Sequence, residues 1–281
     1  MQMVEKRKVE EHYRSDALMD RLQAALSDAG LGDGKLTIEQ LAPLDQFHSR
    51  GLLATVELAK ALSPRANERV LDIGSGLGGP SRYLAATYGC VVAGIDLSES
   101  FVSTATYLAG RAGLDEMVAY QKGDALALPF DDEEFDIAWT QHVAMNIADR
   151  AEFYSEASRI LRPSGRLAVY DVLAGGGGPL VYPVPWSKTS EGSCLLTQDE
   201  MKSHLANAGL EIISWKDRTD AALAWFQALH KQQAAQPALP VGLDLAMGPE
   251  FKIATANLAR NLDEGRAVLI EAVAVKRKVT G

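Results

Sequence analysis

The sequence predicts an α/β fold built around a doubly wound, mostly parallel sheet of seven strands. Three observations predict it. An apolar strand pattern in Val70–Gly79, VLDIGSGLGG, runs into a glycine-rich turn and then into a helix pattern. Strand patterns then alternate with helix patterns, which is typical of parallel sheets with right-handed crossovers. After residue 175 the alternation stops, and the last two strand patterns are expected to pair as a hairpin interrupted by helices.

Length, composition and charge limit the class of protein. The chain has 281 residues, is 47% apolar and has a net charge of −9 without a basic run, which argues against a nucleic-acid partner. No apolar run reaches the roughly 20 residues that span a bilayer, and the first residues lack the apolar core of a signal peptide. We therefore expect a cytoplasmic monomer or homodimer with no nucleic-acid or membrane partner.

The first 65 residues are expected to form a helical cap before the sheet begins. Residues 16–26 carry apolar side chains at helical spacing. Thr37–Gln40 matches a capping box, which opens a short helix that should end near Pro43. A further helix is predicted over residues 52–62.

Residues 66–174 are expected to form the core of the sheet. The predicted strands are Val70–Ile73, Val91–Ile95, Val118–Gln121, Phe135–Trp139 and Arg166–Val172. The helices predicted between them are Pro80–Tyr88, Glu99–Ala112 and Ala151–Leu161.

Residues 175–281 are expected to add a small lid insertion and to complete the same domain. Four glycines at 175–178 precede a stretch rich in prolines and aromatic residues without a period, which favours a lid packed over a site. A second capping box at Thr197–Glu200 opens a helix to Ala208. Strands are then predicted at 210–213 and 266–275, with helices over 221–233 and about 250–262.

The glycine-rich turn is a candidate nucleotide site. Gly74, Gly76 and Gly79 match G-x-G-x-x-G at the carboxyl end of a strand, a pattern that fits NAD as well as S-adenosylmethionine. Asp72 favours the second ligand, because a carboxylate repels a pyrophosphate and attracts a sulfonium compound with an ammonium group. The alternative is that Asp72 only accepts hydrogen bonds from the turn amides.

Polar residues at the ends of the next strands extend this candidate site. Asp96 can accept both hydroxyls of a ribose, or it can cap the helix that follows. Asp124 can accept from an adenine amino group while Ala125 offers its N–H, or it can be an ordinary turn residue. Gln141 and His142 follow the fourth strand, where a transferable methyl group would lie, and His142 could also be an ordinary surface residue.

As a set, the motifs VLDIGSGLGG, GIDLS, GDALALPFDDEEFDIAW and ILRPSGRLAVYDV resemble those of class I S-adenosylmethionine-dependent methyltransferases. This resemblance covers Val70 to about Val172, and it implies a Rossmann-like fold with S-adenosylmethionine as cofactor. The segments EEHYRSDALMDRL, LTIEQLAPLDQFHSRG, GSGLGGPSRYLA and YPVPW resemble the bacterial group of sarcosine/dimethylglycine N-methyltransferase-like proteins.

The narrower resemblance implies that the segment before the first strand folds over the methionine end of the cofactor. It implies that Gln46, His48 and Arg50 line the site, with Arg50 as a charge-assisted partner of the methionine carboxylate. The alternative is a helix start with ordinary polar residues. Ser75 and Leu97, beside Gly76 and Asp96, complete the expected cofactor contacts.

The expected function is methyl transfer from S-adenosylmethionine to a small molecule, first of all to an amine nitrogen of the sarcosine or dimethylglycine type. His142 and, after it, His48 are the candidate bases. Tyr13, Tyr182 and Trp186 are expected to bind the acceptor, and no metal is expected. The lid stretch offers only Lys188 as a cation for an amino-acid carboxylate.

Three alternatives stay open at this point. They are O- or C-methylation of a quinone-like or natural-product acceptor, an NAD-dependent oxidoreductase, and a non-catalytic protein that binds S-adenosylmethionine.

Overall fold

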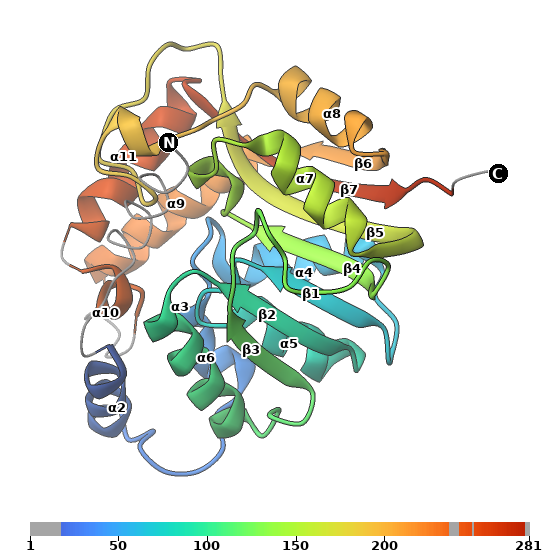
Figure 1. Ribbon diagram of the computed structural model, residues 1–281. Coiled ribbons are helices and arrows are strands. Elements are labelled where there is room, and N and C mark those ends of the chain that lie inside the picture. The colour runs from blue at the N-terminus through green and yellow to red at the C-terminus, as the bar shows by residue number, and fades with distance from the viewer. Residues whose placement is uncertain (1–17, 236–241, 249, 279–281) are drawn as a thin grey trace.

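A seven-stranded sheet forms the centre of the computed structural model, which describes residues 18–235, 242–248 and 250–278 (Figure 1). The strands are β1 (Arg69–Ile73), β2 (Val91–Asp96), β3 (Val118–Lys122), β4 (Phe135–Gln141), β5 (Leu161–Ala174), β6 (Leu210–Asp217) and β7 (Ala267–Lys276). Their order is β3-β2-β1-β4-β5-β7-β6, and only β7 runs antiparallel to its neighbours. The predicted sheet and its closing hairpin are confirmed.

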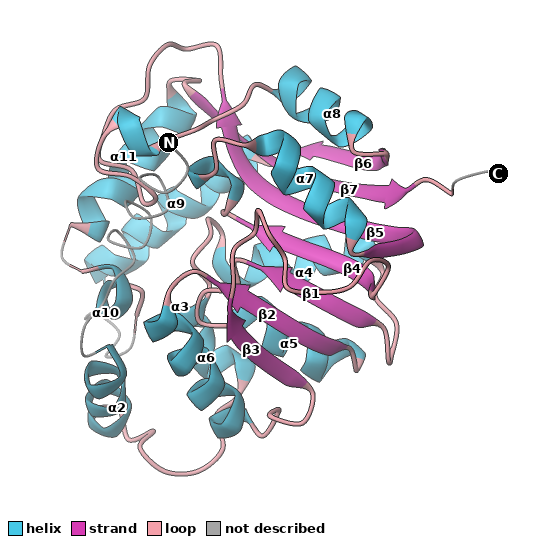
Figure 2. Cartoon of the chain, viewed as in Figure 1, coloured by secondary structure: helices cyan, strands magenta, loops and turns pink. Residues whose placement is uncertain are grey.

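Helices cover both faces of the sheet (Figure 2). They are α2 (Leu18–Asp28), α3 (Ile38–Asp45), α4 (Gly51–Leu62), α5 (Gly79–Tyr88), α6 (Glu99–Ala112), α7 (Arg150–Arg159), α8 (Gln198–Asn207), α9 (Thr219–Ala235), α10 (Asp244–Met247) and α11 (Phe251–Asp263). Val70 of β1 packs in one core with α4 and α5, whereas Leu71 and Ile73 pack in another with α7 and α8. Because both faces of β1 are buried, the neighbouring residues Val70 and Leu71 are both apolar although they point to opposite faces.

Several predicted boundaries differ from the structure, among them the strand predicted at 210–213, which continues to Asp217 as β6. In two other cases tertiary packing outweighs local sequence signals. Helix α3 continues through Pro43 to Asp45, since Leu41 and Leu44 are fully buried. Strand β5 begins at Leu161 rather than at the predicted Arg166, and α7 ends correspondingly early. An irregularity in the pairing of β4 with β5 accommodates this start, which the proline and glycine at 163 and 165 conceal in the sequence.

Both predicted capping boxes are confirmed. The Thr37 and Thr197 side chains accept from the backbone N–H of Gln40 and Glu200, whose side chains accept in return from the cap backbone. Within the described ranges, none of the helices is long and apolar enough to cross a membrane.

A buried ion pair joins the N-terminal helices to the first crossover helix of the sheet. Arg82 of α5 donates from Nη2 to Oδ2 of Asp45 over 2.7 Å, and the side chains are 0% and 2% exposed. A Cβ on Gly79 would lie 2.4 Å from the Asp45 carbonyl oxygen. The end of α3 is therefore fixed against the glycine-rich turn, and only glycine allows that approach.

We expect Asp45→Asn to lower the free energy of unfolding by about 3–5 kcal/mol, because it leaves a buried guanidinium that cannot lose its charge. Arg82→Met should cost less, since an isolated Asp45 carboxylate can take up a proton. Urea unfolding measures both. Arg162→Met, which removes the more exposed pair with Asp136, is the control and should cost least. Equal losses in all three variants would contradict this account.

Candidate active site

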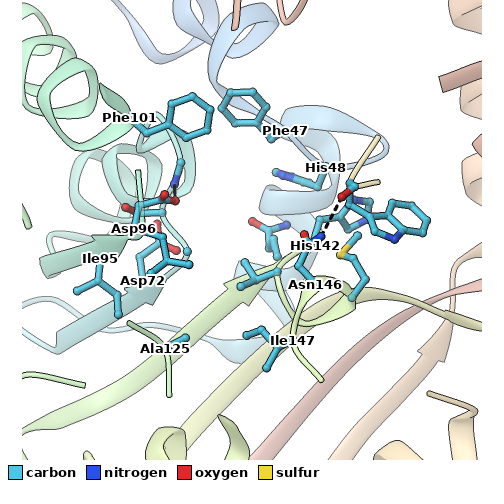
Figure 3. Close-up of a pocket in the computed structure, with 18 of the residues that line it drawn as sticks. Phe47, His48, Asp72, Ile95, Asp96, Phe101, Ala125, His142, Asn146 and Ile147 are labelled. Carbon is cyan, nitrogen blue, oxygen red and sulfur yellow. Dashed lines mark hydrogen bonds between the residues drawn. The ribbon is translucent and has the colours of Figure 1, made fainter. Parts of the chain in front are cut away.

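A pocket lies at the carboxyl ends of β1, β2 and β4 and just after β3, where the strand order reverses between β1 and β4. Each of these four strands or the turn after it supplies one polar side chain, namely Asp72, Asp96, Asp124 or Gln141. Figure 3 shows Asp72 and Asp96 on one side of the pocket and His48, His142 and Asn146 on the other. The pocket therefore has an acidic end and an end with neutral polar groups.

The glycine-rich turn packs directly against the loop that follows β4. Gly74 has φ of +74°, and a Cβ there would lie 2.4 Å from a methyl group of Val143. The backbone N–H groups of Gly74 and Ser75 donate to the carbonyl of Ile95, at distances of 2.9 and 2.8 Å. A side chain at position 74 would thus separate the two loops that meet at the pocket.

Asp72 is a buried carboxyl group at the acidic end. It is 2% exposed, and Ser81 of α5 donates its hydroxyl to Asp72 Oδ2 over 2.5 Å. Burial, opposed by the hydrogen bond from Ser81 and assisted by the neighbouring Asp96, raises the pKa of Asp72 to about 7. The group is therefore poised between its two forms at neutral pH, and a nearby cation would favour the charged form.

Asp96 and Asp124 combine capping with a place in the pocket wall. Asp96 accepts from the backbone N–H of Gly76 at 3.0 Å and of Ser98 at 2.9 Å. An ionised carboxylate accepts about four hydrogen bonds, so Asp96 retains capacity for a ligand. Asp124 accepts from the N–H of Leu126 at 3.0 Å, as a turn residue does. The capping alternatives from the sequence are thus present, and both residues also line the pocket.

A hydrogen-bond network around Thr55 forms the other wall. Its hydroxyl lies 2.7 Å from Gln46 Oε1, 3.2 Å from Gln141 Oε1 and 3.0 Å from His48 Nε2. Gln141 Oε1 also accepts from the indole N–H of Trp139 at 3.0 Å. Because Thr55 has one proton and two amide oxygens face it, His48 Nε2 must donate in its contact with Thr55.

The two histidines of this wall are neutral. Their ring centroids are 6.1 Å apart, and His142 stacks on Tyr170 at 5.6 Å with an angle of 8° between the rings. Burial lowers the pKa of His48 to about 3 and that of His142 well below its usual value. His142 Nε2 is buried without a hydrogen-bond partner. In the protein without ligand, both imidazoles are therefore weak proton acceptors.

The segment of residues 175–196, which we call the lid segment, closes the pocket from the side of the histidines. Asn146 donates from Nδ2 to the Trp186 carbonyl at 2.9 Å, the contact dashed in Figure 3. The Trp186 indole N–H donates to Ser193 Oγ at 2.9 Å, and Arg150 donates to the Cys194 carbonyl at 2.7 Å. Trp186 is 2% exposed and lines the pocket, as the lid prediction requires.

Most residues predicted for the site line one pocket: His48, Asp72, Gly74, Ser75, Gly76, Asp96, Leu97, Asp124, Ala125, Gln141, His142 and Trp186. Three others do not line it. Gln46 lies behind the wall, in contact with Thr55, and Tyr182 is partly buried against the hydrophobic core that contains Val70. Arg50 forms a two-point ion pair with Glu57, at 2.9 and 2.8 Å, instead of facing the pocket. Tyr13 lies outside the described residues.

Several lining residues escaped the sequence analysis, chiefly Phe47, Phe101, Met145, Asn146 and Pro185. Phe47 and Phe101 stack at 5.4 Å with an angle of 17° between the rings (Figure 3). The sequence did offer a signal for Phe47, because it lies between Gln46 and His48, which were both expected to line the site. Phe101 comes one turn into the helix after Asp96, where its ring can face back to the site.

The lining contains several aspartates and two neutral histidines. Five aspartates line the pocket: Asp45, Asp72, Asp96, Asp124 and Asp149. Among the described residues that line it there is no lysine or arginine. Lys188 of the lid segment pairs with Glu250 at the surface. No group of three or more histidine, cysteine or acidic side chains suited to a metal ion occurs in the described part of the chain.

Comparison with known proteins finds methyltransferases. Residues 71–169 match the family described as "Methyltransferase domain". The 27-O-demethylrifamycin SV methyltransferase of Amycolatopsis mediterranei is 34% identical over 189 residues, 64% of this chain and 66% of that protein. The sarcosine/dimethylglycine N-methyltransferase of Halorhodospira halochloris is 31% identical over 177 residues, 63% of each chain. The match thus spans slightly less than two thirds of either relative.

The fold is also similar to that of a geranyl diphosphate C-methyltransferase from Streptomyces coelicolor A3(2). That crystal structure contains Mg²⁺, geranyl-S-thiolodiphosphate and S-adenosyl-L-homocysteine. The TM-score is 0.69 at 16% identity, over 97% of this chain and 98% of the other. The predicted Rossmann-like methyltransferase fold is therefore confirmed.

The raised pKa of Asp72 predicts a pH-dependent loss of stability. The folded protein binds a proton at Asp72 that the unfolded chain releases near pH 4, so this group lowers the free energy of unfolding as pH rises from about 4 to 7. Asp72→Asn should therefore gain stability relative to the wild type as pH rises through this window. Urea unfolding of both proteins at pH 5 and pH 8 measures the difference.

Burial also raises the pKa of Asp171, to about 6. Because Asp171 is present in both the wild type and Asp72→Asn, its contribution cancels when the two pH profiles are compared. Parallel pH profiles for the wild type and Asp72→Asn would mean that Asp72 ionises normally in the folded state.

Proposed function

The chain carries the domain and the fold of class I S-adenosylmethionine-dependent methyltransferases, with S-adenosylmethionine as cofactor, and from this premise we propose that it methylates a small, uncharged acceptor at oxygen. The observation that carries the proposal is the composition of the pocket wall. Asp72 and Asp96 line the side next to the glycine-rich turn, whereas His48, His142 and Asn146 line the opposite side, and the described lining residues include no lysine or arginine.

The residues at the acidic end fit the cofactor. Asp72 would face the ammonium group of its methionine part, and Asp96 would accept from the ribose hydroxyls. Asp124 and the N–H of Ala125 would meet the adenine ring, with Leu97 and the backbone of Gly74–Gly76 beside the sugar and the methionine part. The sulfonium supplies an activated methyl group, so the protein needs no nucleophile of its own. The protein contributes to the reaction by aligning the acceptor with that methyl group.

The neutral end decides between the acceptor classes. An amino acid such as sarcosine would bring a second carboxylate into the pocket beside that of the cofactor, and burying another negative charge without a basic partner is costly. Arg50, the expected partner, is already paired with Glu57, and Lys188 is paired at the surface. The amine acceptor expected first from the sequence is therefore replaced by an uncharged acceptor, for which Met145, Pro185 and Trp186 offer apolar contacts.

His142 is the proposed proton acceptor for a hydroxyl acceptor. The oxygen would form its bond to carbon as the carbon–sulfur bond breaks, and the hydroxyl proton would pass to the unpartnered Nε2 of His142. A low pKa makes this imidazole a poor base for an aliphatic alcohol. A phenol, with its pKa near 10 and its flat apolar ring, is therefore the acceptor that suits this wall best.

One observation favours a second candidate, an amine that carries no carboxylate. Asp149, the lining aspartate that is neither paired with Arg82 nor assigned to the cofactor, would attract an ammonium ion, and the aromatic ring of Trp186 also lines the pocket.

An acceptor panel tests the proposal. A phenol of natural-product size, sarcosine, and a tertiary amine of similar size to the phenol are each incubated with the protein and S-adenosylmethionine. Formation of S-adenosylhomocysteine is measured together with the mass of the product. We expect turnover with the phenol and none with sarcosine. Methylation of sarcosine in preference to the phenol would overturn the proposal, and methylation of the amine alone would select the second candidate.

Asp96→Ala should weaken binding of S-adenosylhomocysteine by more than about 1 kcal/mol, since a buried hydrogen-bond acceptor is lost. Asp96→Asn retains one acceptor oxygen for the backbone cap and should weaken binding less. Calorimetry measures both affinities, and urea unfolding controls for damage to the loop. Affinity equal to that of the wild type in both variants would place Asp96 outside the ribose site.

A further inference from the structure

We propose that Trp139 is a positioning residue that fixes the amide of Gln141 with its two N–H donors available to an oxygen atom of the bound ligands. Trp139 lies in β4, is 0% exposed and does not line the pocket. It would act only through Gln141, which ends the same strand and does line the pocket. The inference rests on the proposed function and adds a determinant of ligand orientation to it.

The indole N–H settles which end of the Gln141 amide faces the core. An indole nitrogen can only donate a hydrogen bond, and it lies 3.0 Å from Gln141 Oε1. The Thr55 hydroxyl lies 3.2 Å from the same oxygen, but its one proton faces Gln46 Oε1 at 2.7 Å, so the indole N–H is the donor that orients the Gln141 amide. If the amide turned over, its NH₂ group would face the indole donor, and a buried donor would lose its acceptor. Trp139 therefore holds the oxygen of Gln141 inward.

The nitrogen of Gln141 is then left without a partner. The Gln141 residue is 9% exposed, and its Nε2 atom is buried with no hydrogen bond. A buried amide nitrogen without an acceptor is costly in the protein alone. At the wall of a pocket, this cost is removed when a ligand brings an oxygen to it. Such an oxygen could belong to the methionine carboxylate of the cofactor or to the methyl acceptor.

A double-mutant cycle tests the coupling between the two residues. Trp139→Phe keeps an aromatic ring but removes the N–H, which frees the amide of Gln141 to turn. Gln141→Met keeps the length of the side chain but removes both donors. In the positioning model, each variant weakens ligand binding about five- to tenfold. The double variant should then lose no more than the worse single variant, because Trp139 acts only through Gln141.

The readouts separate the two sources of the oxygen. Binding of S-adenosylhomocysteine is compared with binding of 5′-methylthioadenosine, which lacks the amino-acid part. If Gln141 holds the methionine carboxylate, the variants weaken only the first. If it holds the acceptor, KM for the acceptor rises while kcat and both nucleoside affinities stay near the wild-type values.

A matched control exists elsewhere in the fold. Trp215 of β6 also donates its indole N–H to a glutamine oxygen, that of Gln198, over 3.2 Å. Trp215→Phe therefore removes the same kind of bond away from the pocket and should leave ligand binding unchanged. Where Trp139→Phe proves too unstable to purify, Gln141→Glu replaces it, since a glutamate still accepts from the indole but offers no donor. This variant should weaken binding at least as much as Gln141→Met.

The outcomes separate this inference from the proposed function. Wild-type protein that neither binds S-adenosylhomocysteine nor methylates any acceptor would overturn the function itself. Normal wild-type activity with unaltered affinities and KM in the Gln141 variants would overturn the inference alone. Additive losses in the double variant would overturn the positioning role of Trp139, because they would mean that Trp139 acts without Gln141.

Discussion

The buried pair of Asp45 and Arg82 is the constraint on which the pocket depends. A guanidinium keeps its charge at any ordinary pH, so it holds Asp45 ionised against the burial that raises the pKa of this carboxyl group. One oxygen of Asp45 accepts from Arg82, and the other accepts from Gln46 Nε2 at 3.3 Å. Gln46 must then present its own oxygen to Thr55. A charge pair in the core thus determines the direction of the hydrogen bonds at the pocket wall.

Sequence patterns predicted the sheet and the acids at its strand ends because both depend on local order along the chain. Asp72, Asp96 and Asp124 follow apolar strand patterns, and parallel strands bring such positions to one edge. Arg50 could not be placed in this way. Its backbone adopts a left-handed conformation, with φ of +69°, and its side chain pairs with Glu57 on the next helix. Neither the conformation nor the partner is visible in the local pattern.

The neutral state of the two histidines follows from the same geometry. Burial removes the water that would stabilise an imidazolium ion, and each ring lies next to the other, so a charge on one disfavours a charge on its neighbour. The donor role of Nε2 in His48 also commits that nitrogen to Thr55. His142 therefore remains as the imidazole with an unpartnered nitrogen, and its weak basicity limits the acceptors that it can serve.

Asp72 and Gln141 show how a binding site costs stability before its ligand arrives. Asp72 raises the free energy of the folded protein when it is ionised, because it is buried beside Asp96 with a neutral hydroxyl as its hydrogen-bond donor. Gln141 adds a buried amide nitrogen without an acceptor. A ligand with a cationic end and a hydrogen-bonding oxygen removes both costs at once. Such a ligand should therefore stabilise the folded state by more than its contact area suggests, since part of its binding energy is relief of charge and of an unmade hydrogen bond.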